Sequence, residues 1–226
     1  MCAAVNLVLA AMVCSQEPYI FGNMFYRRGA WSVVNHHDTN SLPNASIMYE
    51  YFKTAKTHRD LDTLASIVFN RTPTGNLNVS SGSITAHLRM GDNVVDASCW
   101  ETPCTFNGGQ NPLSRATFNR CARWPYKTVV LLGSFKGGGW KTREATSREY
   151  YRRVTRYFET QNKEVVSKVT QANVYDWRAV DRDVIFASRS PFFICSGGTF
   201  SGVLGALVMK NGGKTCNCYR THTGNM

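Results

Sequence analysis

The chain has 226 residues, of which 43% are hydrophobic and 18% charged. This composition excludes a disordered polypeptide and allows either one large folded domain or two small ones. The formal net charge of +11 is uneven: residues 1–125 carry ten basic and eight acidic side chains (+2), and residues 126–226 carry sixteen and seven (+9). The second half therefore suits an anionic partner, such as nucleic acid, anionic lipid or a phosphorylated ligand.

The N-terminal segment predicts a buried helix rather than a membrane anchor. The apolar run from Cys2 to Val13 is too short to span a bilayer, and Asn6 interrupts it. It also lacks the basic flank of a signal peptide. The pattern from Glu17 to Phe25 predicts a strand after this helix. The sequence contains no other candidate transmembrane segment.

Eight cysteines and three glycosylation sequons leave the cellular compartment open. No Cys-x-x-Cys pair repeats and no histidine follows at zinc spacing, so we expect no metal site. The sequons begin at Asn44, Asn70 and Asn78, and they matter only if the chain enters a secretory lumen. The sequence slightly favours the cytoplasm, and a secretory lumen stays open.

The first half predicts helices around one buried strand. Residues 45–69 have the apolar spacing of one or two helices, and residues 83–92 (SITAHLRMGD) predict a strand that ends at a glycine turn. A long irregular segment follows at residues 93–112. Because such loops are uncommon unless they are functional, we interpret it as a candidate lid facing an acceptor. Residues 114–121 predict another helix.

The second half alternates strands with helices. The predicted strands are 128–132, 165–175, 191–195 and 215–220, and the predicted helices are 145–161, 180–188 and 200–209. This alternation predicts an α/β fold with doubly covered parallel strands. Trp124-Pro125 is the expected boundary between an acceptor-side domain (1–125) and a second α/β domain (126–226).

One helix of the second half carries a basic face. Arg148, Arg152 and Arg156 are spaced four residues apart and so share one side of the predicted helix. This face predicts either a nucleic-acid patch or, more commonly, an ordinary solvated helix surface.

Two turns carry the candidate chemistry. His87 and Arg89 lie at the carboxyl end of the predicted buried strand, where open α/β sheets bind ligands. The planar, permanently charged arginine fork suits a phosphate, although an ion pair with Asp92 is an equally plain interpretation.

The second turn runs from Ser196 to Ser201 and leads directly into an apolar helix. Such a turn presents free backbone N–H groups and the positive end of the helix dipole to a phosphate. The alternative is that its glycines only allow a close strand-to-helix turn. Taken together, the two turns favour a ligand bound in a cleft between two α/β domains.

At these residues the chain resembles a known family. HLRMGD (87–92) resembles the His-x-Arg-x-Gly-Asp motif of the fucosyltransferase superfamily, which includes the α1,2-, α1,6- and protein-O-fucosyltransferases. The segment from Asp183 through FFICSGGTFSGVLGAL resembles the C-terminal donor motif of the α1,2-fucosyltransferases. The two blocks cover 31 of 226 residues. The chain departs from the family in its short length, in Met90 where many members have a second arginine, and in lacking a visible opening strand with a glycine-rich turn.

The resemblance implies an inverting, metal-independent glycosyltransferase of GT-B type, with two Rossmann-like domains facing a cleft. Because no opening strand is visible, we expect a compact form whose N-terminal domain lacks its first strand. The resemblance implies that Arg89 holds the β-phosphate and stabilises the leaving nucleotide diphosphate. It also implies that two residues contact the nucleoside, His87 and Asp183. The residues implied to hold the pyrophosphate and base are Gly198, Thr199, Phe200 and Ser201. The expected partners are a nucleotide sugar, GDP-fucose first among them, and a glycan acceptor. No metal or other cofactor is expected.

An inverting transfer also requires a carboxylate to accept the proton of the acceptor hydroxyl. Asp92, Asp96 and Glu101 follow the strand, and the motif singles out none of them. Three alternatives stay open: a rhamnosyl or other nucleotide-sugar donor, a catalytically inactive nucleotide-sugar-binding protein, and a basic nucleic-acid-binding protein.

Overall fold

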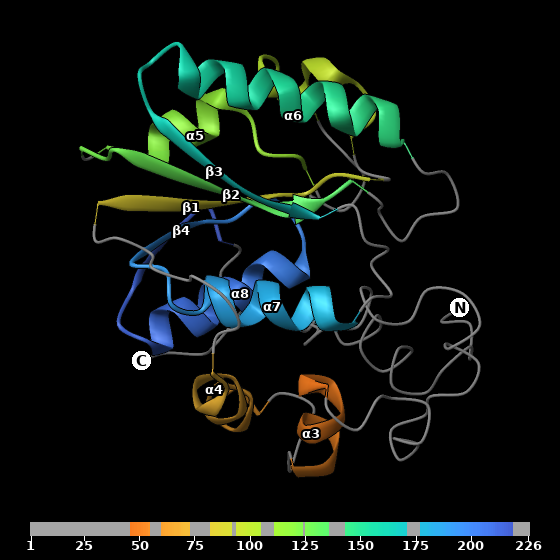
Figure 1. The fold of residues 1–226 in the computed structure, drawn as a ribbon, viewed down its shortest axis with the longest axis vertical. Coiled ribbons are helices and arrows are strands. Elements are labelled where there is room, and N and C mark those ends of the chain that lie inside the picture. The colour runs from red at the N-terminus through yellow and green to blue at the C-terminus, as the bar shows by residue number, and fades with distance from the viewer. Residues whose placement is uncertain are drawn as a thin grey trace.

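The computed structural model describes residues 46–54, 60–72, 82–91, 94–104, 111–123, 125–135, 143–170 and 177–218. Their core is a five-stranded, wholly parallel sheet with the strand order β3-β2-β1-β4-β5 (Figure 1). The elements in chain order are α3 (Ile47–Thr54), α4 (Leu61–Asn70), β1 (Ser83–Leu88), η1 (Ala97–Trp100), α5 (Arg115–Cys121), β2 (Thr128–Ser134), α6 (Glu144–Glu159), β3 (Glu164–Thr170), α7 (Trp177–Ala187), β4 (Phe192–Ile194), α8 (Thr199–Lys210) and β5 (Lys214–Cys216).

The central strands are buried on both faces, as their apolar composition predicts. β1 pairs with β2 over six residues, from Ser83 opposite Thr128 to Leu88 opposite Gly133, and with β4 on its other side. Every residue of β1 is buried. A strand covered on both faces needs no polar face, and this explains the continuous apolar runs.

Helices cover both faces of the sheet (Figure 1). α5 and α6 lie on one face, α7 and α8 lie on the other, and α3 with α4 forms a further layer against α7 and α8. Each face has its own hydrophobic cluster, in which alternate residues of a strand take part. Leu131 of β2 thus belongs to the α5–α6 side, and Leu132 to the α7–α8 side.

The α/β prediction is confirmed, and the sheet has the parallel, helix-flanked form of a Rossmann-like fold. A domain boundary at residues 125 and 126 would separate β1 from its neighbours β2 and β4, which are hydrogen-bonded to it. The sheet therefore crosses the predicted boundary. Within the described residues, the two motif-bearing halves of the sequence build one sheet.

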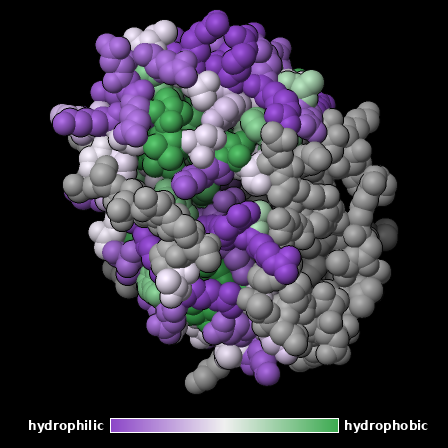
Figure 2. All heavy atoms as spheres, in the orientation of Figure 1, coloured by the Kyte–Doolittle hydropathy of each residue, from purple (hydrophilic) through white to green (hydrophobic). Residues whose placement is uncertain are grey.

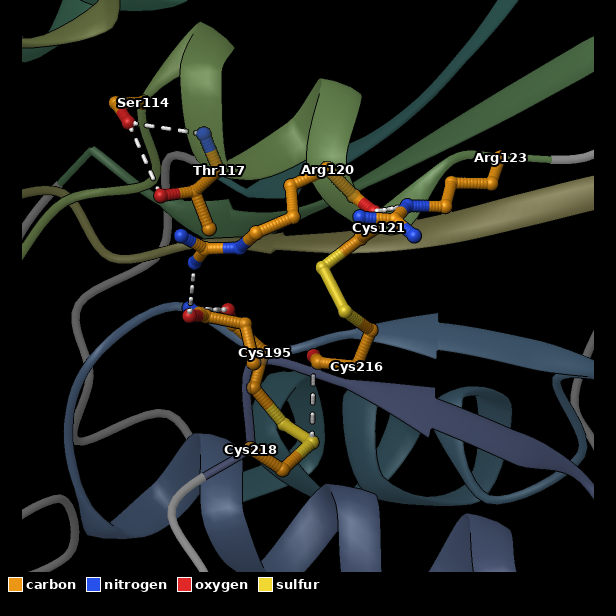
Figure 3. The surroundings of a disulfide bond; sticks show 9 residues. Ser114, Thr117, Arg120, Cys121, Arg123, Cys195, Cys216 and Cys218 are labelled. Carbon is orange, nitrogen blue, oxygen red and sulfur yellow. Dashed lines mark hydrogen bonds between the residues drawn. A yellow bond between two sulfur atoms is a disulfide. The ribbon is translucent and has the colours of Figure 1, made fainter.

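Three disulfide bonds join the elements on the β4–β5 side of the sheet and in the loop after β1. They link Cys99 to Cys104, Cys121 to Cys216, and Cys195 to Cys218, which accounts for every cysteine in the described part of the chain. In Figure 3, Cys121 of α5 reaches across to Cys216 of β5, and Cys195 at the end of β4 joins Cys218 just beyond β5. Two covalent links thus hold the short edge strand β5 in place. The sequence left this oxidation state open.

Some predicted elements differ in extent from the structure. β5 ends at Cys216 rather than Arg220, because the next residue, Asn217, adopts a left-handed backbone with φ of 59°. In the predicted lid at 93–112, η1 packs against α6, and Trp100 is 1% exposed. That part of the segment belongs to the core because a buried indole fixes it there. The predicted helix at 2–13 and strand at 17–25 lie outside the described residues.

No helix among the described residues is long and apolar enough to cross a membrane. In the view of Figure 2, hydrophilic side chains cover most of the coloured surface, with hydrophobic residues in small separate groups.

Candidate functional site

The structure brings the two predicted turns to one point of the sheet. β1 and β4 are adjacent parallel strands, so Arg89 after β1 and the Ser196–Gly198 turn after β4 leave the same edge side by side. The chain order of the strands reverses between β1 and β4, because β2 and β3 lie to one side and β5 to the other. In open α/β sheets this switch point is where ligands bind, outside the carboxyl ends of the strands.

The turn after β1 is held in place from both sides. Leu88 and Met90 are almost completely buried, and they flank the half-buried Arg89. Gly91 has a positive φ of 78°, and its backbone N–H donates to the hydroxyl of Ser147 on α6 at 2.9 Å. Ser147 is itself fully buried. The backbone that carries Arg89 is therefore anchored to a neighbouring helix.

The turn after β4 requires glycine at its contact with Arg89. Gly198, which caps α8, has φ 105° and ψ 159°, a conformation that is essentially restricted to glycine. A Cβ atom at this position would overlap Nη1 of Arg89 and lie 3.0 Å from its Cζ. The guanidinium therefore lies directly against the backbone at the start of α8. One residue earlier, the N–H of Gly197 donates to the carbonyl of Asn111 at 2.9 Å.

His87, in β1, links the turn that carries Arg89 to the turn after β4. Its Nδ1 lies 2.8 Å from the hydroxyl oxygen of Ser196, and its ring contacts the ring of Phe200 edge-on at 5.6 Å. Burial, together with the nearby charge of Arg89, lowers the pKa of His87 to about 3. The imidazole is therefore neutral at physiological pH, and the guanidinium is the cation of this group.

The first turn of α8 supplies polar groups beside Arg89. Thr199 is the first residue of the helix, and the N–H groups of a helix start have no partner within the helix. Phe200 and Ser201 are buried. The hydroxyl of Ser201 has no hydrogen-bond partner within the described structure. A guanidinium and a helix start together can bind a phosphate or diphosphate.

The two predicted carboxylates in the described residues, Asp96 and Glu101, have partners in or near η1. Asp96 caps η1 by accepting from the N–H of Ser98 at 2.8 Å, and this hydrogen bond lowers its pKa. Glu101 forms an ion pair with Arg153 at 3.2 Å. Asp92, the residue after Gly91, lies outside the described residues.

Asp183 lies within α7 and does not take part in the contacts that join His87, Ser196, Arg89 and Gly198. Burial raises the pKa of its carboxyl well above the usual value. The nearby charge of Arg182 acts in the opposite direction, and no contact in the described structure joins Asp183 to the guanidinium of Arg89.

Three arginines on α6 have acidic partners on the same helix. Arg148 pairs with Glu144 at 2.7 Å, and both Arg152 and Arg153 pair with Glu149, at 2.7 and 3.0 Å. Such pairs at helical spacing are typical of a solvated helix surface. Two of the three arginines of the predicted basic face, Arg148 and Arg152, are thus engaged in ion pairs.

Sequence reasoning missed three residues that shape the site: Ser147, Ser196 as the partner of His87, and Gly133. A side chain at Gly133 would collide with the carbonyl of Leu88. The available signal was a small or polar residue inside an apolar pattern, such as Ser147 on the buried stripe of α6. Their partners lie far away in the sequence, so spacing alone could not identify them.

No family model, curated protein or solved structure matches this chain. No group of metal-ligating side chains occurs among the residues that the structure describes.

Proposed function

We propose that this protein is an inverting glycosyltransferase that binds the diphosphate of a nucleotide sugar between Arg89 and the start of α8. The observation that carries this proposal is the placement of the Arg89 guanidinium against Gly198 at the switch point of the sheet. Two motifs that resemble the fucosyltransferase superfamily thus meet at one site, although Arg89 and Gly198 lie 109 positions apart in the chain.

In this proposal the chain supplies positive potential where negative charge develops. When the bond between the sugar and the diphosphate breaks, charge builds up on the β-phosphate oxygens. Arg89 can donate two parallel hydrogen bonds to these oxygens, and the backbone N–H groups at the start of α8 can donate from the other side. Preorganised donors of this kind lower the barrier because they need no rearrangement as the charge appears.

His87 serves as a positioning residue. Its side chain is 6% exposed and neutral, and it bonds Ser196 in the opposite turn. A buried neutral imidazole can hold the two turns at a fixed separation without competing with Arg89 for the phosphate. This role differs from the direct nucleoside contact that the family resemblance implies.

The acceptor half of the reaction is assigned from the sequence. The acceptor hydroxyl attacks the anomeric carbon from the face opposite the diphosphate, and a carboxylate takes its proton. Asp92 follows Gly91 in the same turn as Arg89. Asp96 is the weaker candidate base, because its hydrogen bond to Ser98 holds its pKa below the usual value.

The donor and the architecture are proposed from the family resemblance. The expected donor is GDP-fucose, with a rhamnosyl or other deoxy-sugar nucleotide as the alternative. In a two-domain GT-B arrangement, the described sheet would be the donor-binding domain. The domain boundary would then precede β1 instead of following Pro125, because β1 belongs to this sheet.

A hydrolase based on Ser196 and His87 is not favoured, although the two side chains are within hydrogen-bonding distance. Ser196 is 1% exposed, so its hydroxyl is covered and an acyl substrate cannot approach it. A basic nucleic-acid-binding role is also not favoured, since Arg148 and Arg152 of the predicted basic face are paired with glutamates.

Thermal shift with a panel of nucleotides and oligonucleotides, followed by a sugar-transfer assay, tests the proposal. At a ligand concentration a hundredfold above Kd, binding adds about 2.7 kcal/mol to the free energy of unfolding. We expect stabilisation by a nucleotide diphosphate and no stabilisation by oligonucleotides. Binding without transfer to any glycan acceptor would identify an inactive nucleotide-sugar-binding protein.

Arg89→Ala and Arg156→Ala form a matched pair of variants for this assay. Each removes one positive charge, but Arg156 is exposed in the last turn of α6, away from the carboxyl edge of the sheet. We expect Arg89→Ala to abolish transfer and weaken diphosphate binding while the fold survives. We expect Arg156→Ala to behave like the wild type. An Arg89→Ala enzyme with normal transfer would contradict the proposal.

A further inference from the structure

We propose that Asn70 is an N-glycosylation site and that the protein matures in a disulfide-forming compartment. This inference is independent of the proposed transferase activity. It rests on two separate observations, the disulfide framework and the exposure of one sequon on the folded surface.

The disulfides point to the compartment. All six cysteines in the described ranges are paired, and the bridges join α5 to β5 and the end of β4 to the segment after β5. Stable disulfides form and persist in secreted, extracellular and lumenal proteins and are rare where the glutathione pool keeps thiols reduced. The same lumen contains the machinery that glycosylates Asn-x-Ser/Thr sequons.

The sequon Asn70-Arg71-Thr72 ends α4 on its outward face. Asp62, Ser66 and Asn70 follow one another at four-residue spacing, and all three are exposed. The buried residues of α4 lie on the opposite face, among them Leu64 and Val68, and this face joins the cluster beneath α7 and α8. Figure 1 shows α4 in the outermost layer of the described structure.

Arg71, the middle residue of the sequon, points toward the protein, whereas Asn70 and Thr72, which define the sequon, are exposed. The guanidinium of Arg71 pairs with Glu50 at 2.8 Å and lies 3.6 Å from the carboxylate of Asp181. Its backbone is extended, with φ −82° and ψ 132°, so the chain leaves the helix at this point. Asn70 and Thr72 are both exposed. A glycan on Asn70 would therefore extend into solvent without displacing a packed side chain.

The position of Asn70 also keeps a glycan away from the candidate site. Arg189 donates to the carbonyl of Arg71 at 2.8 Å and to that of Phe69 at 3.3 Å. Arg189 lies just before β4 begins, whereas Ser196 and Gly198 follow the end of β4. The sequon thus lies toward the amino-terminal edge of the sheet, and the candidate site lies at the carboxyl edge.

The test uses the full chain expressed with a secretory leader in cultured eukaryotic cells. Asn44→Gln and Asn78→Gln are present throughout, so that Asn70 is the remaining sequon. The readouts are the gel mobility of the secreted protein before and after peptide N-glycosidase, and peptide mass spectrometry for the Asn-to-Asp conversion that the glycosidase leaves at residue 70.

Thr72→Ala and Thr72→Ser are the paired variants, because Thr72 is exposed and serine preserves the sequon. We expect a glycosidase-sensitive shift in the parent and in Thr72→Ser, and its complete loss in Thr72→Ala and Asn70→Gln. Secreted, folded parent protein without a glycan on Asn70 would overturn the site. Six free thiols in the described part of that folded protein would overturn the compartment. Both results are read without a transfer assay, so they are distinct from a failure of the proposed function.

Discussion

Replacing Gly198 by alanine tests the contact on which the candidate site depends. At φ 105° and ψ 159°, the backbone at this position is strained for any residue with a Cβ, and such strain costs about 1–3 kcal/mol. The new methyl group would also overlap the guanidinium of Arg89. We therefore expect Gly198→Ala to lower the free energy of unfolding and to push Arg89 out of its position.

Gly202→Ala is the matched control on the same helix. Gly202 lies one turn further along α8, and a Cβ there would meet no atom within 4 Å. Alanine is favoured over glycine in a helix interior by roughly 1 kcal/mol, so this variant is expected to be as stable as the wild type or slightly more stable. The difference between the two alanine variants isolates the special geometry of position 198.

A double-mutant cycle separates the backbone strain from the collision with Arg89. In the Arg89→Ala background, Gly198→Ala retains only the strain, so its effect on urea unfolding should be smaller than in the wild type. Coupling between residues in contact is usually 0.5–3 kcal/mol. Additive effects of the two substitutions would refute the contact.

The same variant weakens the binding of a nucleotide diphosphate. A hydrogen bond to a charged group contributes about 1.5–3 kcal/mol, which corresponds to roughly ten- to hundredfold in Kd. Calorimetry on Gly198→Ala and Gly202→Ala measures this loss. Equal Kd values in the two variants would show that diphosphate binding does not require the observed position of the Arg89 side chain.

Three further predictions concern stability, measured as the free energy of unfolding in urea. Cys121→Ser, which opens a bridge of sequence separation 95, should destabilise more than Cys99→Ser, which opens one of separation 5; loop-closure entropy gives about 4.7 and about 2 kcal/mol. The two variants should be equally stable if loop closure does not govern the effect. The pKa of His87 is about 3 in the folded protein, against 6.5 for an ordinary histidine. Its contribution to the free energy of unfolding is therefore complete above pH 6.5 and is lost as the pH falls toward 3. His87→Asn should flatten this dependence of stability on pH, and an unchanged dependence would contradict the burial of His87 as a neutral group. Burial raises the pKa of Asp181 from 3.8 to about 6. Its contribution to the free energy of unfolding is therefore complete below pH 3.8 and is lost as the pH rises through 6, and Asp181→Asn should remove this loss of stability. A wild-type slope between pH 4 and 6 in that variant would show that the carboxyl is not the responsible group.

The elements of the sheet could be predicted because each one carries a local signal. Ile84 and Leu88 alternate with the residues that face the other side of β1, and the apolar run from Val129 to Leu132 predicts a strand that is covered on both faces. The sequence predicts a loop around Trp100, because its short helix has no periodic pattern. Only its contacts with α6 and the rings of Phe118 and Phe158 bring it into the core.

The candidate site was predictable in its two turns but not in its connections. Arg89 and Gly198 could be identified from residue type and from their position after a strand. That they touch follows from β1 and β4 being neighbours, which is a pairing between segments about 100 residues apart. The same holds for the bridge between Cys121 and Cys216, since spacing along the chain does not determine which cysteines meet.

A crystal structure of the protein with a bound nucleotide diphosphate tests the central claim most directly. The account predicts the β-phosphate within hydrogen-bonding distance of the Arg89 guanidinium and of the backbone N–H groups at the start of α8. A diphosphate bound elsewhere on the chain, with Arg89 still resting on Gly198 and free of phosphate, would contradict it.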